Sequence, residues 1–164
     1  MKVVLTGGPC CGKTSLINEF EKRGYNVMHE KAREIIEESE TINLDYLHRE
    51  IVIRQGREEN GIEGLVFLDR GLVDVVGYCN FHKIKIPKEL EEIELSGRYK
   101  HIFLLDRIPF VNDGLRLEKG DEEADRTHEY VANAYSKYGF SQINVPVIDL
   151  EKRADYILER INDD

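Results

Sequence analysis

The sequence has no hydrophobic run long enough to cross a membrane. Its apolar stretches are short, as at residues 3–5 and 102–105, whereas a membrane-spanning helix needs roughly 20 apolar residues. The N-terminus passes from Met1-Lys2 directly into a short strand pattern and a glycine loop, which differs from the pattern of a signal peptide. We therefore expect no membrane insertion and a cytoplasmic location.

Cysteine is scarce, and zinc-binding patterns are missing. The three cysteines are Cys10, Cys11 and Cys79. Because the number is odd and two of them are adjacent, we expect no disulfide framework, and a reduced protein is indicated. The five histidines do not fall at ligand spacing, and there is no Cys-x-x-Cys pair, so a zinc site has no support.

An excess of positive charge is also absent. The 32 acidic residues outnumber the 23 basic residues, which gives a formal net charge of -9. Nucleic acids and anionic lipid surfaces are bound by a basic face, so this balance argues against generic binding to either. A local basic pocket for a phosphate group remains compatible with it.

Strand and helix patterns alternate along the 164 residues. Compact apolar runs, typical of strands buried on both faces, occur at residues 2–6, 26–29, 65–69, 101–106 and 144–150. Helical patterns lie between and after them, at residues 13–23, 31–39, 44–59, 72–81, 87–95, 122–138 and 152–162. Since strands that alternate with helices form parallel sheets covered on both faces, we expect a single α/β domain over residues 1–164.

A glycine loop follows the first strand pattern and opens the first helix pattern. It fits G-x-x-x-x-G-K-[ST] at every fixed position, and it consists of Gly7, Gly8, Pro9, Cys10, Cys11, Gly12, Lys13 and Thr14, followed by Ser15. Glycines let backbone N–H groups curl around phosphate oxygens, and the helix N-terminus attracts the same anion. Lys13 then reaches the β- and γ-phosphates, and the Thr14 hydroxyl is the expected Mg²⁺ ligand. The loop therefore predicts binding of a nucleoside triphosphate with Mg²⁺.

Two of the cysteines lie inside this loop. Cys10 and Cys11 are close to a helix N-terminus, which favours the thiolate form. A redox switch is one interpretation, since an oxidised loop could not surround a phosphate. The simpler interpretation, which we favour, is that small side chains fit a loop whose backbone does the binding.

Charged residues follow two other strand patterns. Asp69 and Arg70 end the third strand pattern, and Glu30 and Arg33 come just after the second. Ligands of open α/β sheets bind at the carboxyl ends of the strands, so we expect these side chains beside the loop. Asp69 can hold Mg²⁺ or accept a proton from an attacking hydroxyl, and Arg70 can clamp a phosphoryl group or the acceptor. Glu30, Arg33 and Arg70 are the candidates for binding the acceptor; helix capping and solvent-exposed charge are the alternatives.

A charged loop precedes the long helix pattern. Arg116 lies in this loop, and Arg126 lies early in the helix that follows. A mobile loop that carries arginines can exclude water from a kinase site and neutralise the transition state. We therefore predict a short lid at about residues 107–126, with an ordinary charged surface loop as the alternative.

Three stretches resemble a known family. They are GGPCCGKT from Gly7, EKAREI from Glu30 and FVNDGLRLE from Phe110, and they are similar to the AAA-like P-loop family that contains the bacterial nicotinamide riboside kinase domain. The similarity continues into residue 145 and so spans nearly the whole chain. It implies a nucleoside- and nucleotide-kinase-type P-loop NTPase fold, a three-layer sandwich with five parallel strands in the order 2-3-1-4-5. It also assigns Arg116 and Arg126 to the lid and agrees with the roles inferred above for the other residues.

One triplet departs from the riboside kinase pattern. Asp69-Arg70-Gly71 looks more like the Asp-Arg or Glu-Arg element of deoxynucleoside and thymidylate kinases, which leaves the acceptor open. We predict a Mg²⁺-dependent kinase that transfers the γ-phosphoryl group of ATP or GTP to a hydroxyl of a small, nucleoside-like acceptor. The residues predicted to be catalytic are Lys13, Asp69, Arg70, Arg116 and Arg126. The family also includes members that resemble GTP- and phosphoinositide-binding regulators, so a nucleotide-dependent switch or a slow NTPase that acts through a partner is the second hypothesis.

Overall fold

The computed structural model describes residues 1–39, 41, 43–109 and 119–162. In chain order its elements are β1 (Lys2–Thr6), α1 (Lys13–Lys22), β2 (Asn26–Met28), α2 (Lys31–Glu37), α3 (Leu44–Gly61), β3 (Val66–Asp69), α4 (Leu72–His82), η1 (Lys88–Leu90), β4 (His101–Leu105), α5 (Asp121–Lys137), β5 (Gln142–Val145) and α6 (Leu150–Asn162). Among these residues, no helix combines the length and the apolar character needed to cross a bilayer.

The strands form one parallel sheet in the order β2-β3-β1-β4-β5. This arrangement confirms the strand order that the resemblance implied and the α/β fold class that the sequence pattern predicted. The central strand β1 pairs with β3 and β4, and its Leu5 is aligned with Asp69 on one side and Phe103 on the other. The segments that follow β1 and β3 therefore leave the same edge of the sheet side by side. This register brings the glycine loop next to Asp69 and Arg70.

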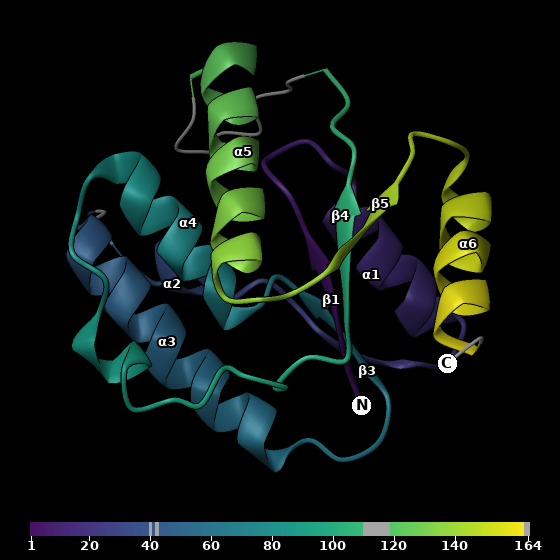
Figure 1. Ribbon diagram of the computed structural model, residues 1–164, viewed down its shortest axis with the longest axis horizontal. Coiled ribbons are helices and arrows are strands. Elements are labelled where there is room, and N and C mark those ends of the chain that lie inside the picture. Colours follow the sequence, from purple (N-terminus) through teal and green to yellow (C-terminus); the bar gives the residue numbers. More distant parts are fainter. Residues whose placement is uncertain (40, 42, 110–118, 163–164) are drawn as a thin grey trace.

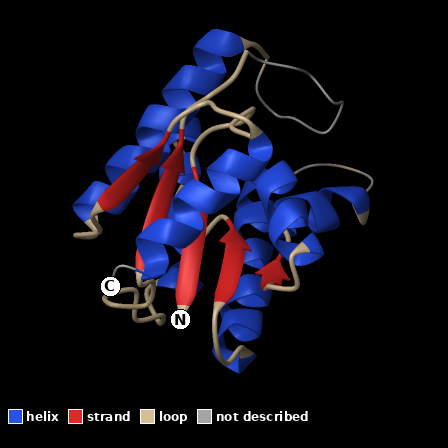
Figure 2. Cartoon of the chain, turned by 90° about the vertical axis from the view of Figure 1, so that its right-hand side faces the viewer, coloured by secondary structure: helices blue, strands red, loops and turns tan. Residues whose placement is uncertain are grey.

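Helices cover both faces of the sheet. Figure 1 shows α1 and α6 on one side and α3, α4 and α5 on the other, and in Figure 2 the strands lie between these two layers. Two buried apolar clusters fill the spaces between the layers. In one of them Phe20 of α1 stacks on Phe67 of β3, with ring centroids 3.9 Å apart. Burying each such ring contributes about 1.5–3 kcal/mol. The apolar clusters on the two faces of the sheet therefore stabilise the central strands, and the glycine loop follows one of these strands.

The structure corrects one predicted helix and the bounds of the last strand and the last helix. Residues 87–95 do not form an α-helix: only the short 3₁₀ turn η1 is present, and its backbone N–H groups bond to carbonyls three residues back. β5 covers Gln142–Val145 instead of residues 144–150, and Leu150 already belongs to α6. The strand ends where Pro146 follows, because proline has no N–H to donate to a neighbouring strand.

Candidate active site

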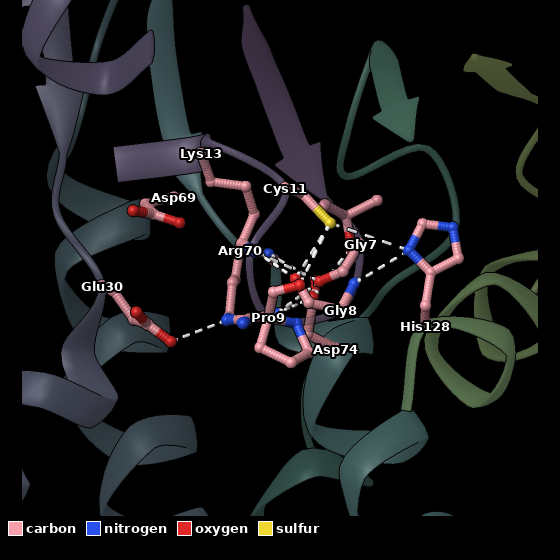
Figure 3. A network of polar contacts seen from close by, with 12 residues as sticks. Gly7, Gly8, Pro9, Cys11, Lys13, Glu30, Asp69, Arg70, Asp74 and His128 are labelled. Atoms are coloured by element: carbon pink, nitrogen blue, oxygen red, sulfur yellow. Dashed lines mark hydrogen bonds and ion pairs between the residues drawn. The ribbon is translucent and has the colours of Figure 1, made fainter. Parts of the chain in front are cut away.

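The glycine loop connects the buried strand β1 to the first turn of α1. Gly7, Cys10 and Gly12 have φ angles of 129°, 56° and 77°, in the left-handed region that glycine adopts most readily. The buried Lys13 side chain folds back over the loop, and its Nζ donates hydrogen bonds to the carbonyls of Gly7 (3.2 Å) and Gly8 (2.6 Å). Lys13 is thus held at the centre of the loop, as Figure 3 shows.

Asp69 and Thr14 form a pair suited to a divalent cation. Thr14 Oγ1 donates to Asp69 Oδ2 at 3.0 Å, and the buried Asp69 Oδ1 has no hydrogen-bond partner among the described residues. An unpartnered buried carboxylate oxygen beside a hydroxyl fits Mg²⁺, which prefers oxygen ligands. The described residues contain no group of three or more His, Cys, Asp or Glu side chains that could hold a metal ion by themselves, so the remaining ligands would be phosphate and water oxygens.

The charge on Asp69 is unfavourable in the folded protein. Burial and the nearby Glu30 carboxylate raise its pKa from 3.8 to about 6, against the opposing effects of Lys13, Arg70 and Thr14. A carboxyl with a raised pKa gains from a cation placed beside it. The electrostatics therefore agree with the unpartnered oxygen in favouring a cation at this position.

Arg70 connects the loop with a second group of charges. It has a left-handed backbone (φ 76°), and its guanidinium contacts Glu30 (2.7 Å), Asp74 (3.1 Å) and the Gly7 carbonyl (2.9 Å). It also lies 5.0 Å from the ring centroid of Tyr78. Burial opposes the charge, but Tyr78, Glu30 and Asp74 raise the pKa of Arg70 well above its ordinary value. Arg70 is therefore fixed in place and charged.

Glu30 follows β2 and remains ionised. Burial alone would raise its pKa, but Arg70, Lys13 and Arg33 hold the pKa of this carboxyl below its ordinary value. Arg33, one turn into α2, lies 3.4 Å from Glu30. Glu30, Arg33, Asp69 and Arg70 all line one pocket, together with apolar side chains from α2, α3 and α4. The structure thus brings together the four charged residues that the sequence placed at the strand ends.

Gln55 on α3 also lines this pocket, and sequence reasoning did not single it out. Its buried amide nitrogen donates to Glu59 Oε1 (2.9 Å) and to the Arg70 carbonyl (3.0 Å). Arg98 (2.6 Å) and the Tyr99 hydroxyl (3.0 Å) hold Glu59 in turn. Both partners of the amide nitrogen are acceptors, so the orientation of the amide is fixed and its oxygen is left for a ligand that donates.

Two further residues were missed by sequence reasoning. Asp74 accepts from Arg70, from Thr6 Oγ1 (2.8 Å) and from the Tyr135 hydroxyl (2.6 Å). His128 of α5 contacts the glycine loop. For Asp74 the signal was its position in the first turn of α4, four residues after Arg70. For His128 no local signal exists, because the contact depends on how α5 packs.

The predicted lid is only partly described. Arg116 and the rest of residues 110–118 lie outside the described residues, so this part of the lid stays a prediction. At its start, Arg107 pairs with Asp121 (2.8 Å) and Asp125 (2.7 Å) of α5. Arg126 is exposed, with its guanidinium 5.5 Å from the ring centroid of Phe81. In the described part of the chain no hydrogen bond or ion pair joins Arg126 to the glycine loop, and its catalytic role stays a prediction.

The loop cysteines are buried and are not disulfide-bonded. Cys11 Sγ donates to the Gly8 carbonyl at 3.1 Å. Burial raises the pKa of the Cys11 thiol, although four nearby cations lower it in part. A thiol with a raised pKa is less reactive, which favours the packing interpretation over a redox switch for Cys11.

Comparison with known proteins identifies the family. The AAA domain family matches residues 2–153 of the sequence. The chain belongs to this family. Its architecture is the P-loop fold of nucleoside and nucleotide kinases. No curated protein matches the sequence.

Solved structures of similar fold share little sequence with this AAA domain. Deoxyadenosine kinase from M. mycoides with bound dATP has a TM-score of 0.63 and 13% identity, over 99% of this chain and 100% of that chain. Thymidylate kinase from Ehrlichia chaffeensis has a TM-score of 0.65 and 14% identity, over 99% and 98%. The NadR protein in complex with NAD and AMP-PNP has a TM-score of 0.65 and 20% identity, over 96% of this chain and 48% of that chain. At these identities the similarity establishes the fold.

Proposed function

We propose that this protein is a Mg²⁺-dependent kinase that transfers the γ-phosphoryl group of ATP or GTP to a hydroxyl of a small, nucleoside-like acceptor. The supporting observation is the pocket beside the glycine loop, which is lined by Glu30, Arg33, Asp69 and Arg70. Hydrolysis needs only water as acceptor, whereas a second pocket with fixed charges suits a second substrate. The kinase fold of the structural neighbours agrees with this choice.

The donor half of the site is the glycine loop. Lys13 and the loop N–H groups bind the phosphates, and the Thr14 hydroxyl and the Asp69 carboxylate would hold Mg²⁺. When bound, Mg²⁺ neutralises negative charge on the β- and γ-phosphate oxygens. Among the described residues, the hydrogen bonds of Lys13 Nζ go to neutral carbonyls, so exchange of these bonds for charged phosphate oxygens is favourable.

The acceptor half is the charged pocket. The acceptor oxygen forms a bond to the γ-phosphorus, the bond from that phosphorus to the bridging oxygen breaks, and a nucleoside diphosphate leaves. The hydroxyl proton goes to a carboxylate: Asp69 is the base predicted from the sequence, and Glu30 is an ionised second candidate. Arg70, with Arg116 and Arg126 of the predicted lid, would neutralise the charge that develops during transfer.

The test is release of nucleoside diphosphate from Mg·ATP and from Mg·GTP, with and without pools of nucleosides and nucleoside monophosphates. Release that depends on one pool supports the kinase and narrows the acceptor. Slow release indifferent to every pool would instead favour the switch or the NTPase. Lys13→Ala and Glu30→Gln are the paired controls: the first should weaken nucleotide binding, and the second should remove only acceptor-dependent release.

A further inference from the structure

A histidine from α5 contacts the glycine loop. His128 Nδ1 accepts a hydrogen bond from the Gly8 N–H at 3.1 Å and lies 3.8 Å from Cys11 Sγ. Figure 3 shows the imidazole on the side of the loop away from Glu30 and Asp69. His128 therefore does not touch the acceptor pocket, and the function proposed above assigns it no role.

The contact is close because two glycines face α5. A Cβ atom on Gly8 would lie 2.8 Å from the Ala124 carbonyl oxygen and 2.9 Å from His128 Cβ. A Cβ atom on Gly7 would lie 3.3 Å from His128 Cε1 and 3.0 Å from the Leu105 carbonyl oxygen. The first two loop glycines thus allow α5 to pack directly on the backbone of the loop, in addition to allowing the loop to curl.

The hydrogen bond fixes the protonation state of the imidazole. Because Gly8 N–H donates to Nδ1, that nitrogen carries a lone pair, and neutral His128 keeps its proton on Nε2. Burial lowers the pKa of His128, and the cations of Lys13 and Arg107 lower it further, while Asp106 and Asp125 act in the opposite direction. The surroundings therefore favour the neutral form that the contact requires.

One peptide group connects His128 with both cations of the site. The Gly8 N–H and the Gly7 carbonyl belong to the same peptide unit, which is trans, so they point in opposite directions. With the N–H directed at His128, the Gly7 carbonyl oxygen faces the other way and accepts from Lys13 Nζ (3.2 Å) and from the Arg70 guanidinium (2.9 Å). Rotation of this peptide would break all three hydrogen bonds together.

We propose that His128 is a positioning residue for nucleotide binding: by accepting the Gly8 N–H, it orients the Gly7–Gly8 peptide so that the carbonyl oxygen places Lys13 and Arg70. The proposal rests on the proposed function only in that the loop binds a nucleotide. It requires no particular acceptor and no turnover, so direct binding of ADP tests it separately from the kinase activity.

The decisive comparison is His128→Asn with His128→Leu. The Oδ1 atom of asparagine can occupy the place of Nδ1 and accept the Gly8 N–H, whereas leucine has a similar volume and no acceptor. Loss of one hydrogen bond that leaves a buried donor unpaired corresponds to about a tenfold weaker binding. We expect His128→Leu to weaken ADP binding about tenfold by calorimetry and His128→Asn to stay within about twofold of the wild type. Equal losses of ADP affinity in the two variants, or no loss in His128→Leu, would overturn the proposal.

Two further readouts separate positioning from a general structural role. The first is the ratio of ADP affinities of the wild type and His128→Asn across pH, which cancels the titration of the ligand. This ratio should decrease as the pH is lowered below 6.5, because protonated His128 cannot accept the Gly8 N–H; a ratio that does not change with pH would count against the proposal.

The second readout is a double-mutant cycle: in a Lys13→Ala background, His128→Leu should cost less ADP affinity than in the wild type. An undiminished loss there would mean that His128 does not act through Lys13.

Discussion

Replacing Asp69 with asparagine should stabilise the folded protein in the absence of nucleotide and Mg²⁺, and should also abolish its turnover. The pKa of the Asp69 carboxyl is raised from 3.8 to about 6 by burial and by the Glu30 charge. A shift of about 2 units corresponds to about 3 kcal/mol of destabilisation by the ionised form. Asparagine keeps the shape and can still accept from Thr14 Oγ1, but it carries no charge, so this cost is removed.

The direction of the Asp69 pKa shift determines how the stability gain from Asp69→Asn varies with pH. A carboxyl whose pKa is raised by folding binds its proton more tightly in the folded state, so its ionisation destabilises the fold as the pH rises from about 4 through 6. The gain from Asp69→Asn should be about 3 kcal/mol near pH 8 and about 1 kcal/mol near pH 4.5. Urea unfolding of the wild type and of Asp69→Asn at these two pH values measures the difference in unfolding free energy.

A charge-matched control is Asp106→Asn, which removes one negative charge at an exposed position at the end of β4. It should not reproduce the gain near pH 8. Addition of Mg·ADP should then stabilise the wild type more than Asp69→Asn, because a ligand that binds only the folded state stabilises it by mass action. If Asp69→Asn were no more stable than the wild type near pH 8, or if its gain did not change with pH, the electrostatic argument for this site would be wrong.

Three other substitutions test separate parts of the structure. Glu30→Gln removes a charge that raises the pKa of Asp69, so without Mg²⁺ the stability gain from Asp69→Asn near pH 8 should be smaller in the Glu30→Gln background, as measured by urea unfolding; an equal gain in both backgrounds would mean that Glu30 does not act on Asp69. Gln55 presents an amide oxygen, so acceptors with an amino or amide donor should have a lower KM, by about tenfold, than analogues with a carbonyl there. Gln55→Leu should remove that preference, which paired KM measurements would show. Gly77→Ala would place a Cβ 2.6 Å from Val131 Cα. It should destabilise the α4–α5 contact by about 1–3 kcal/mol, measured as a lower urea midpoint; unchanged stability would mean that these helices separate easily.

The phosphate loop and the strand-end charges could be predicted because their signals are local. The loop is one contiguous motif between a strand and a helix, and its identification needs no tertiary information. Glu30, Asp69 and Arg70 follow strands, so the rule that ligands bind at carboxyl ends was sufficient to place them together. The strand order came from the resemblance to a known family, since periodicity alone does not fix which strands are neighbours.

The residues that were missed lie on helices and depend on packing. Gln55 is one turn after Ile51 on the buried side of α3, so a polar residue at an apolar position was the available signal. Whether such an amide is structural or faces a ligand depends on Glu59, Arg98 and Tyr99. Arg98 and Tyr99 lie 39 and 40 residues after Glu59 in the sequence, which is why periodicity could not reveal their contact with it.

The contacts of Lys13 and Arg70 suggest how the two cations divide the work. Both donate to the Gly7 carbonyl. Within the described ranges, the other hydrogen bond of Lys13 goes to the neutral Gly8 carbonyl, whereas Arg70 also pairs with Glu30 and Asp74. Bonds between charged groups are stronger than bonds to neutral carbonyls. An arriving phosphate therefore displaces the partners of Lys13 more easily than those of Arg70. We expect Lys13 to follow the donor nucleotide while Arg70 stays with the carboxylates of the acceptor pocket, so that the Gly7 carbonyl marks the boundary between the two halves of the site.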